Sequence, residues 1–485
     1  MEATIVRRRE KLSVGFSENK AIIFLTCLLI PLLTIISPLL AIVFIYGFGL
    51  FLLFKSDYKF LIFFICFIFM QNILLVVCAN KFTPTTNTLY ALSKEIMLYA
   101  FCLKSLFVVK DRKAKCFIIL IAALYILLTG VSFFRSDASF MSKVISIRQI
   151  FLPFVCFFFG YFLEIDDKKK KRIFDLIVVL AIITAVIGFL DFFVFQNSIW
   201  SKLPFATYQA NKGTEFDLRN GVPLNFYTWD FADVFGVVAR RLVSIQADPL
   251  TTAHFLFLGF VLTGYSNLKR KRLIKWVLFI ASVLTLCKGV YIGFVVYFAL
   301  MILKRLNYKQ FRNLFIVGAL IAAALFSTAV TIISKVAPGS SIVIHIRGLI
   351  DGFVNTSFLG YGIGKAGVMV SVKTGIDRIT GESYIGIVLA QLGVVGFALY
   401  VIFTICLIFR LYYFYSTHGR KDVFIPVCLL LSVFIESFFS ESSVGLIATG
   451  LYFVLAGQSF ATFNKKKKVY KISASKIEST ETQVA

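Results

Sequence analysis

Acidic residues are scarce in this sequence of 485 residues, and charged residues of either sign are few for its length. Aspartate and glutamate together number 25, against 51 lysines and arginines, and all charged residues amount to 16% of the chain. Hydrophobic residues make up 59% and aromatic residues 16%. This composition excludes an ordinary soluble domain and indicates a chain that crosses a membrane many times.

The sequence also lacks the features of several common chemistries. It has no phosphate-binding loop of the form GxxxxGK[ST], so we expect no ATP-driven reaction and no cofactor. Its nine cysteines all fall in or at the edges of hydrophobic runs, which predicts neither a disulfide framework nor a thiolate metal site. The first apolar run leads straight into a second one, so we expect no cleaved signal peptide.

The excess of positive charge, +26 overall, is divided among short clusters between hydrophobic runs. This distribution is typical of cytoplasmic loops that orient a membrane protein, and it argues against a nucleic-acid partner. The strongest clusters lie at 7–11, 110–115, 166–172, 269–272 and 465–468.

Hydrophobic runs long enough to cross a bilayer, about 17 to 25 residues, recur along the whole chain. They predict an all-α polytopic membrane protein with about 14 transmembrane helices. A cytoplasmic N-terminus then puts every strong basic cluster on one side and both long polar segments on the other. The predicted spans are 20–36, 38–54, 60–79, 90–109, 116–134, 148–164, 173–195, 249–267, 273–287, 289–303, 313–333, 383–410, 422–439 and 443–461.

These spans predict seven consecutive regions. We expect a cytoplasmic N-terminus at 1–19 and a transmembrane scaffold at 20–195, then an extracytoplasmic loop at 196–247 and more transmembrane helices at 248–333. A large extracytoplasmic loop follows at 334–382, with C-terminal transmembrane helices at 383–461 and a cytoplasmic tail at 462–485. The loop at 334–382 is rich in glycine and charge and too long for a simple connection, so we expect it to be catalytic.

Several basic residues on the predicted outer side run against the usual bias of positive charge toward the cytoplasm. Arg240 and Arg241 precede a span that opens at Pro249, Arg148 opens another span, and Lys288 separates two half-length runs. Arginine binds phosphate oxygens well, because its planar guanidinium presents several donors and stays charged. Alternatively, the arginines anchor the chain at the membrane interface, and Lys288 caps a tight turn at the outer surface.

The large loop supplies the remaining candidates. Arg347 and Arg378 are basic, and His345 shares a face with Arg347 in a strand but not in a helix. A lone histidine is more often a polar contact than a catalyst. The glycine-rich stretch 359–367 would let the backbone approach a ligand. Glu382 stands before a long span and could act as a general base, or it could stabilise the start of a helix through the helix dipole.

At these residues the chain resembles the bacterial O-antigen ligase and polymerase superfamily of integral membrane glycosyltransferases. The resemblance covers about a third of the chain, roughly 240–409, and depends on the order and spacing of four degenerate patterns. These are RLVSIQADP from Arg241, LCKGVYIGFV around Lys288, Arg347 with the following LGYGIG, and ESYIGIVLAQLGVVG from Glu382. Ligases of the superfamily usually carry histidine and asparagine where this chain has Glu382 and Ser383. That departure favours a polymerase of the Wzy type.

The resemblance implies a GT-C-like fold in a bacterial inner membrane, with the active site facing the periplasm or the cell exterior. It implies an inverting, metal-independent transfer of a glycan chain from undecaprenyl diphosphate to a repeat unit on the same carrier. Membrane lipids would be partners, and a chain-length regulator protein would be a further partner. In this scheme Arg241, Arg347 and Glu382 are catalytic, and the residues that bind substrate are Arg148, Arg240, Lys288, His345 and Arg378.

Two alternatives stay open at this point. A terminal ligase of the same superfamily would share the arginines and differ in its acceptor. A flippase for lipid-linked oligosaccharides would also have many spans, but it should lack long outer loops.

Overall fold

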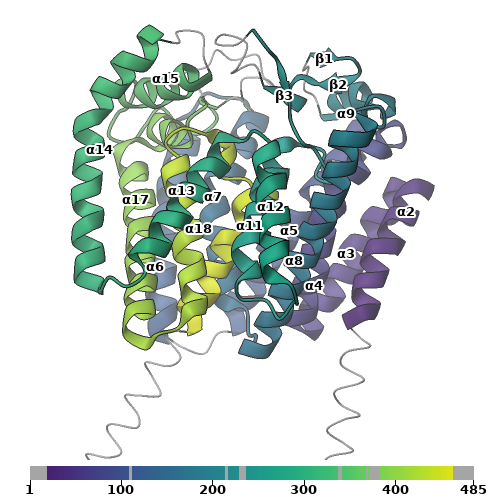
Figure 1. The fold of residues 1–485 in the computed structure, drawn as a ribbon, viewed down its shortest axis with the longest axis horizontal. Coiled ribbons are helices and arrows are strands. Elements are labelled where there is room, and N and C mark those ends of the chain that lie inside the picture. Colours follow the sequence, from purple (N-terminus) through teal and green to yellow (C-terminus); the bar gives the residue numbers. More distant parts are fainter. Residues whose placement is uncertain are drawn as a thin grey trace, which may run out of the picture. The chain divides into compact units, whose positions relative to one another are not determined.

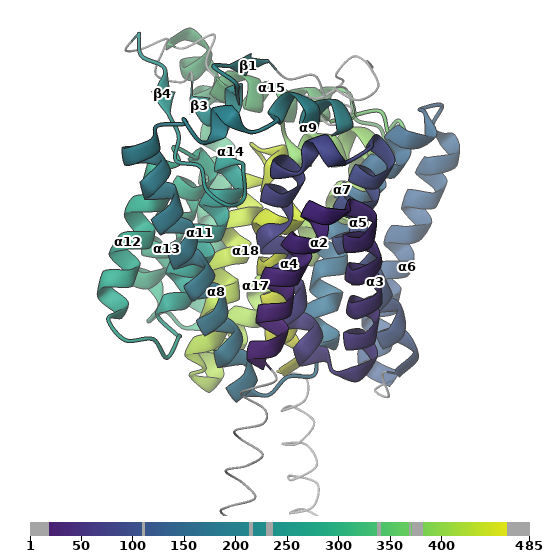
Figure 2. The same ribbon diagram turned by 90° about the vertical axis from the view of Figure 1, so that its right-hand side faces the viewer.

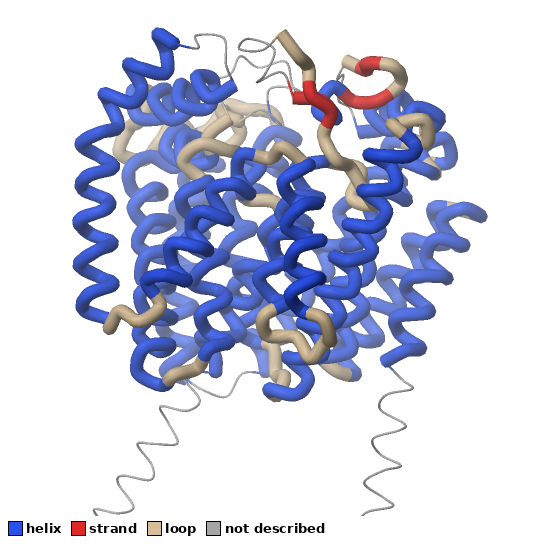
Figure 3. The backbone as a smooth tube through the Cα atoms, in the orientation of Figure 1, coloured by secondary structure: helices blue, strands red, loops and turns tan. Residues whose placement is uncertain are grey.

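The computed structural model describes residues 19–108, 112–212, 217–228, 236–336, 341–367, 370 and 382–462. In these residues the chain is mostly helical, and its four strands are only two residues long each (Figure 3). It divides into two compact units, each made of two separate stretches of chain. Unit 1 comprises 1–103 and 163–290, and unit 2 comprises 104–162 and 291–485.

Unit 1 begins with helices at the N-terminal end of the chain (Figure 2). They are η1 (Leu25–Leu29), α2 (Ile30–Ile36), α3 (Pro38–Lys55), α4 (Asp57–Val77), η2 (Ala79–Lys81) and most of α5 (Pro84–Val108). The unit continues with α8 (Asp167–Phe189), η3 (Leu190–Phe195), η4 (Trp200–Lys202), α9 (Phe205–Lys212), η5 (Leu224–Phe226), α11 (Pro249–Thr263) and α12 (Lys271–Leu284). α11 packs against both α8 and α12, which also contact each other (Figure 1).

Local sequence explains where several helices of unit 1 begin. Asp166 caps α8, because its carboxylate accepts a hydrogen bond from the backbone N–H of Lys169 at 2.7 Å. Asp248 caps α11 in the same way, accepting from the N–H of Thr251 at 2.7 Å. Pro249 then occupies the first helical position, where a missing N–H costs nothing.

Two small antiparallel hairpins occupy the polar segment before α11. β1 (Leu218–Arg219) pairs with β2 (Val222–Pro223), and β3 (Tyr227–Thr228) pairs with β4 (Ala239–Arg240). In the second hairpin, Tyr227 stands opposite Arg240. The segment predicted as a loop at 196–247 therefore has structure of its own.

Unit 2 contains the remaining helices. They are α6 (Arg112–Arg135), α7 (Phe140–Phe162), α13 (Lys288–Leu303, which begins in unit 1), α14 (Tyr308–Val336), α15 (Ser341–Val354), α17 (Tyr384–His418), η6 (Lys421–Val423), α18 (Phe424–Glu436), η7 (Glu441–Ser443) and η8 (Leu446–Gly450), whose helix continues to 462. The predicted loop at 334–382 thus includes a helix of 14 residues, α15.

The prediction of an all-α, multi-pass membrane protein is confirmed at this level. A helix coincides with each of the predicted spans, and six helices in the described residues are long and apolar enough to cross a membrane. Those six are Asn19–Ile36, Pro38–Lys55, Asp57–Val77, Phe140–Phe162, Asp167–Phe195 and Tyr384–His418. The total of fourteen spans and the GT-C-like fold stay predictions.

α17 is the longest helix in the part of the chain that the structure describes, and it is broken near its start. Gly393 has φ 69° and ψ −166°, which is not a helical conformation and suits glycine best. The break leaves carbonyls and N–H groups without partners inside the helix. A loop from another part of unit 2 supplies those partners, as described below.

Candidate functional site

The first group of candidate residues lies in unit 1, on a polar segment with its own small hydrophobic core. Trp200, Phe205 and Phe226 are almost fully buried there together with aliphatic side chains. The rings of Trp200 and Phe205 both meet Phe226 edge to face, with centroid distances of 5.9 and 5.5 Å. Burial of each such side chain contributes about 2 kcal/mol. The core therefore supports the hairpin that carries Arg240, and Arg241 directly follows this hairpin.

Arg240 uses every nitrogen of its guanidinium inside the protein. Nε donates to Asn197 Oδ1 at 2.9 Å, and the two terminal nitrogens donate to the carbonyls of Phe192 and Asp191 at 3.0 and 3.1 Å. One of them also lies 2.5 Å from Asp191 Oδ2, in a pair whose side chains are 17% and 4% exposed. Arg240 therefore has a structural role here. It could contact a substrate only if these hydrogen bonds were broken.

Arg241, the next residue, has donors to spare. Its backbone N–H is bonded to the carbonyl of Phe226 at 2.8 Å, which continues the hairpin. Its side chain makes one long hydrogen bond, 3.5 Å to the carbonyl of Asn225. Its Nε is buried and has no hydrogen-bond partner in the part of the chain that the structure describes. A buried donor without a partner calls for an explanation, and a bound anion is one.

Lys288 lies near the same segment. The N–H of Leu242 donates to the carbonyl of Leu284 at 2.8 Å, so the chain after Arg241 contacts the C-terminal end of α12. A tight turn with Leu286 at φ 51° follows, and Lys288 then opens α13, half buried. The two predicted half-length runs are thus separate helices.

The second group lies in unit 2, where α15 crosses the start of α17 at very short range. A Cβ atom placed on Gly386 would lie 2.2 Å from the carbonyl oxygen of Gly348, and one on Gly352 would lie 2.4 Å from the Cα of Gly386. Only glycines permit this approach. Gly348 and Gly352 are four residues apart on α15, so they lie on the same face of that helix.

The crossing brings His345 and Glu382 together. His345 Nδ1 lies 3.3 Å from Glu382 Oε2, and the two side chains are 19% and 42% exposed. Ser383, not Glu382, caps α17, because its Oγ accepts from the N–H of Gly386 at 3.0 Å. Glu382 therefore stands one residue before the cap and reaches α15 instead. Arg347 is exposed on the same helix and forms no hydrogen bond or ion pair within the described residues.

A second acidic residue, Glu441, is connected to Glu382 by a backbone hydrogen bond. The N–H of Glu441 donates to the carbonyl of Glu382 at 2.8 Å, and the buried Glu441 side chain accepts from Gln149 Nε2 at 3.1 Å. Gln149 belongs to α7 and follows Arg148. Arg148 was expected to open a span, but α7 already begins at Phe140, so Arg148 lies well inside the helix and is half buried.

The glycine-rich stretch 359–367 has a structural use. The N–H groups of Tyr361 and Gly362 donate to the carbonyls of Ala390 and Gln391 at 2.8 and 3.2 Å, which seals the break in α17. Gln391 is fully buried and bridges the stretch with its side chain, accepting from the N–H of Gly364 at 2.9 Å and donating to the carbonyl of Ala366 at 2.8 Å. We predicted that the backbone of this stretch would approach a ligand closely. In the structure it approaches α17.

The predicted site residues therefore fall into two sets. Arg240, Arg241 and Lys288 belong to unit 1, whereas Arg148, His345, Arg347 and Glu382 belong to unit 2. Arg378 lies outside the described residues. Gln149 was not predicted, because an isolated glutamine within a hydrophobic run carries no signal of its own.

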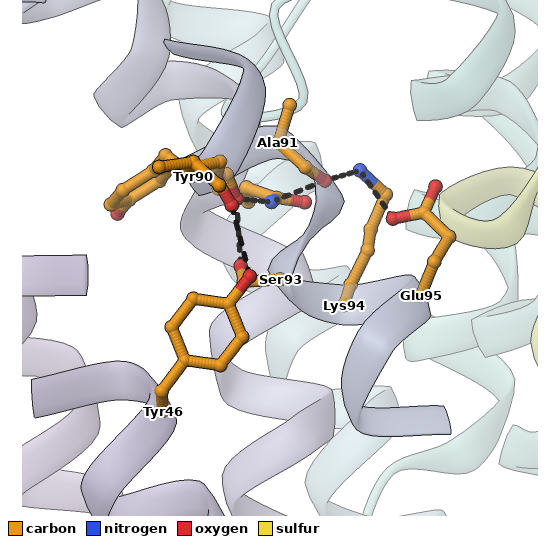
Figure 4. Close-up of polar contacts among 8 residues, drawn as sticks. Tyr46, Tyr90, Ala91, Ser93, Lys94 and Glu95 are labelled. Atoms are coloured by element: carbon orange, nitrogen blue, oxygen red, sulfur yellow. Dashed lines mark hydrogen bonds and ion pairs between the residues drawn. The ribbon is translucent and has the colours of Figure 1, made fainter. Parts of the chain in front are cut away.

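A buried polar cluster on α5 was not predicted either (Figure 4). Lys94 and Glu95 lie near the middle of this helix, 3.6 Å apart, and their side chains are 12% and 6% exposed. Lys94 donates to the carbonyl of Ala91 at 2.7 Å, and Gln71 of α4 donates to the carbonyls of Tyr90 and Ala91 at 2.7 and 3.1 Å. Because charges inside membrane helices are costly, such residues are usually paired and often functional.

The described residues contain no group of three or more histidine, cysteine, aspartate or glutamate side chains that could hold a metal ion. No protein-family model matches the chain, and no curated protein is significantly similar to it.

Proposed function

We propose that this protein is a polysaccharide polymerase of a bacterial cytoplasmic membrane. It transfers a glycan chain from undecaprenyl diphosphate to a repeat unit that is itself linked to undecaprenyl diphosphate. The ordered sequence patterns from Arg241 to the start of α17 support this proposal. The structural observation that supports it most is the contact of Glu382 with His345, because it places a carboxylate and an imidazole together just before the start of α17.

The reaction requires one bond to form and one to break. A hydroxyl oxygen of the acceptor sugar attacks the anomeric carbon of the donor, and the bond from that carbon to the diphosphate oxygen breaks. The electron pair leaves with the diphosphate, and the hydroxyl proton passes to a base. Attack from the face opposite the leaving group inverts the anomeric centre.

The negative charge that develops on the diphosphate requires cations held in place before the reaction. Arg241 in unit 1 and Arg347 in unit 2 are separate candidates for this role, because each has guanidinium donors that the described residues leave uncommitted. Fixed donors in a site with little water stabilise such charge strongly. In this proposal arginines replace the magnesium ion that neutralises diphosphate in many other enzymes, so the reaction is metal-independent.

The acceptor side requires a base, and Glu382 supplies the carboxylate for it. The helices would hold both polyprenyl tails, and their surfaces suit this task because many large hydrophobic side chains are exposed on them, including Val43 and Phe54 on α3 and Ile302 on α13. The active site would face the periplasm or the cell exterior. A chain-length regulator protein is a further proposed partner.

A reconstituted assay tests this function. Purified protein in liposomes is given undecaprenyl-diphosphate-linked repeat units, and the products are resolved as a ladder. Arg241→Ala and Arg347→Ala should each reduce elongation by about 100-fold or more, as loss of a charge-stabilising donor does in other enzymes. Arg312→Ala, which removes an exposed arginine of α14, serves as the matched control and should elongate normally.

The outcomes separate the alternatives. Elongation by wild type and by both arginine variants would contradict the assignment of the arginines. No elongation, with transfer of preformed chains to a lipid acceptor of another type, would identify a ligase. Movement of lipid-linked repeat units across the bilayer without transfer would identify a flippase.

A further inference from the structure

α14 packs tightly on α17 near its start and separates from it further along. The ring of Phe311 stacks on that of Tyr412 with centroids 3.7 Å apart, and Phe315 meets Phe409 edge to face at 5.2 Å. The hydroxyl of Tyr412 also donates a hydrogen bond to the carbonyl of Leu306 at 2.9 Å, just before α14 begins. These contacts join the start of α14 to the second half of α17.

Beyond this aromatic contact both helices expose the faces that they turn toward each other. Every residue from 316 to 325 on α14 is exposed, and this run makes about three turns, so the side toward α17 is exposed as well. Ile402 and Cys406 lie on the same face of α17 as Phe409. Both are exposed, Ile402 by 59%. An opening between α14 and α17 therefore begins within one turn of the aromatic contact.

α15 bounds this opening at its other end. It contacts both α14 and α17, and its Phe353 meets Phe397 of α17 edge to face at 5.9 Å. Figure 1 shows α15 above α14 and α17. The stretch of α14 that lines the opening reads IVGALIAAAL from 316 to 325, which contains no polar side chain. The opening is therefore apolar, bounded at both ends and open toward the bilayer.

The shape and the charge of this part of unit 2 select the kind of molecule that fits. Two helices pack with their axes 8–10 Å apart, so a helix cannot enter the end where the opening narrows to ring contact, whereas a hydrocarbon chain can. Arg347 is exposed on α15 and forms no ion pair within the described residues with Asp351, four residues further along. A molecule with an apolar chain and a phosphate head group would complement both the opening and this arginine.

We propose that the opening between α14 and α17 holds the polyprenyl chain of the donor lipid, and this rests on the proposed function. The donor is the lipid whose diphosphate gains negative charge as its bond to the anomeric carbon breaks, so its head group is the one that requires Arg347. The chain enters sideways from the bilayer, because α14 is exposed on every face from 316 to 325. The polyprenyl diphosphate that remains after transfer has the same chain and head group, so it binds at the same place.

Site-specific photo-cross-linking tests this proposal without requiring turnover. An amino acid that carries benzophenone replaces Ile402 in the opening, and Cys406 on the same face provides a second position. The matched control carries it in place of Ile302, which is 80% exposed on α13. Each purified protein in liposomes is given radiolabelled undecaprenyl diphosphate and irradiated. We expect strong labelling at positions 402 and 406 and only background labelling at position 302.

Competition and a charge variant identify the lipid. An excess of unlabelled undecaprenyl diphosphate should abolish the label at position 402, and the same excess of phosphatidylglycerol should leave it unchanged. At limiting lipid, Arg347→Ala should reduce this label by about tenfold, because a hydrogen bond to a charged group contributes about that much to binding. Arg312→Ala, which removes an exposed arginine of α14, should leave the label as in wild type.

Other results would overturn the proposal. Equal label at positions 402 and 302, or displacement by phosphatidylglycerol, would show that the opening holds bulk lipid only. A cross-link from position 402 to a second copy of the protein would make the opening a protein interface. Folding of each variant is checked by gel filtration. Wild type that elongates, with no specific label at 402 or 406, would contradict this inference alone. Specific label without elongation by wild type would contradict the polymerase and leave a site for a lipid diphosphate.

Discussion

The two long polar segments of this protein hold their candidate residues in different ways. The segment before α11 has a small aromatic core around Trp200 and two hairpins, so it fixes Arg240 and Arg241 by folding on itself. The segment before α17 contributes α15 and a glycine-rich stretch, which fix His345 and Glu382 by close contact with a broken helix. The segment before α11 is held in place by buried aromatic side chains, whereas the segment before α17 is held by close contact between backbones.

The difference shows why adjacent or similar residues need not share a role. Arg240 and Arg241 are neighbours in sequence, yet the guanidinium of one is saturated by Asp191, Phe192 and Asn197, and the other keeps a buried donor without a partner in the described chain. In unit 2, the glycines that look suited to a ligand instead complete the hydrogen bonding of α17. Three sets of variants test this contrast.

The largest expected effect is on the stability of the first segment. Arg240→Ala would leave the Asp191 carboxylate buried without its cation, and loss of one member of a buried pair costs about 3 to 5 kcal/mol. Arg241→Ala should leave the midpoint of thermal unfolding in detergent almost unchanged, although it abolishes elongation. The double variant Asp191→Ala/Arg240→Ala should recover part of the lost stability. Equal melting temperatures for the two single arginine variants would contradict the separate roles given to them.

A smaller effect is expected at the glycine crossing of the second segment. Gly386→Ala would place a methyl group 2.2 Å from the carbonyl oxygen of Gly348 and push α15 away from α17. Overpacking of this kind costs about 1 to 3 kcal/mol. Elongation should fall as well, because His345 moves away from Glu382. The matched control is Gly318→Ala on α14, where an added Cβ would meet nothing within 4 Å. A Gly386→Ala variant as stable and active as this control would show that the crossing is not needed.

The smallest effect concerns the ion pair that joins the glycine-rich stretch to the loop between α6 and α7. A hydrogen bond from Lys365 is the main cause that lowers the pKa of the Asp137 carboxyl. The stability that it contributes is present above the usual aspartate pKa and is lost as pH falls through the lowered value. Asp137→Asn should therefore melt slightly below wild type at pH 7, and the two curves should converge in acid. A difference that persists at acidic pH would assign the effect to another interaction.

Much of this architecture was predictable because hydrophobic length and charge placement are local signals. Each predicted span coincides with a helix, and the positions of Pro38 and Pro249 mark helix starts directly. The pairing of His345 with Glu382 was not predictable, because it depends on how α15 lies across α17. The hydrogen bonds of the Arg240 guanidinium were not predictable either. They depend on Asp191, which lies in a predicted span, and on the turn that follows it. Lys94 and Glu95 lay inside a predicted span, so their charge was outweighed by the apolar residues around them.

The most direct test of the central claim is a gel of surface glycan from a strain that lacks this gene, complemented with wild type or with Glu382→Gln. A polymerase predicts single repeat units on an intact anchor in the deletion strain and a full ladder with wild type. Glu382→Gln should fail to restore that ladder although the protein is present in the membrane. If the deletion strain instead accumulates long chains on the lipid carrier that never reach the anchor, the protein joins finished chains and does not build them, and the proposal is wrong.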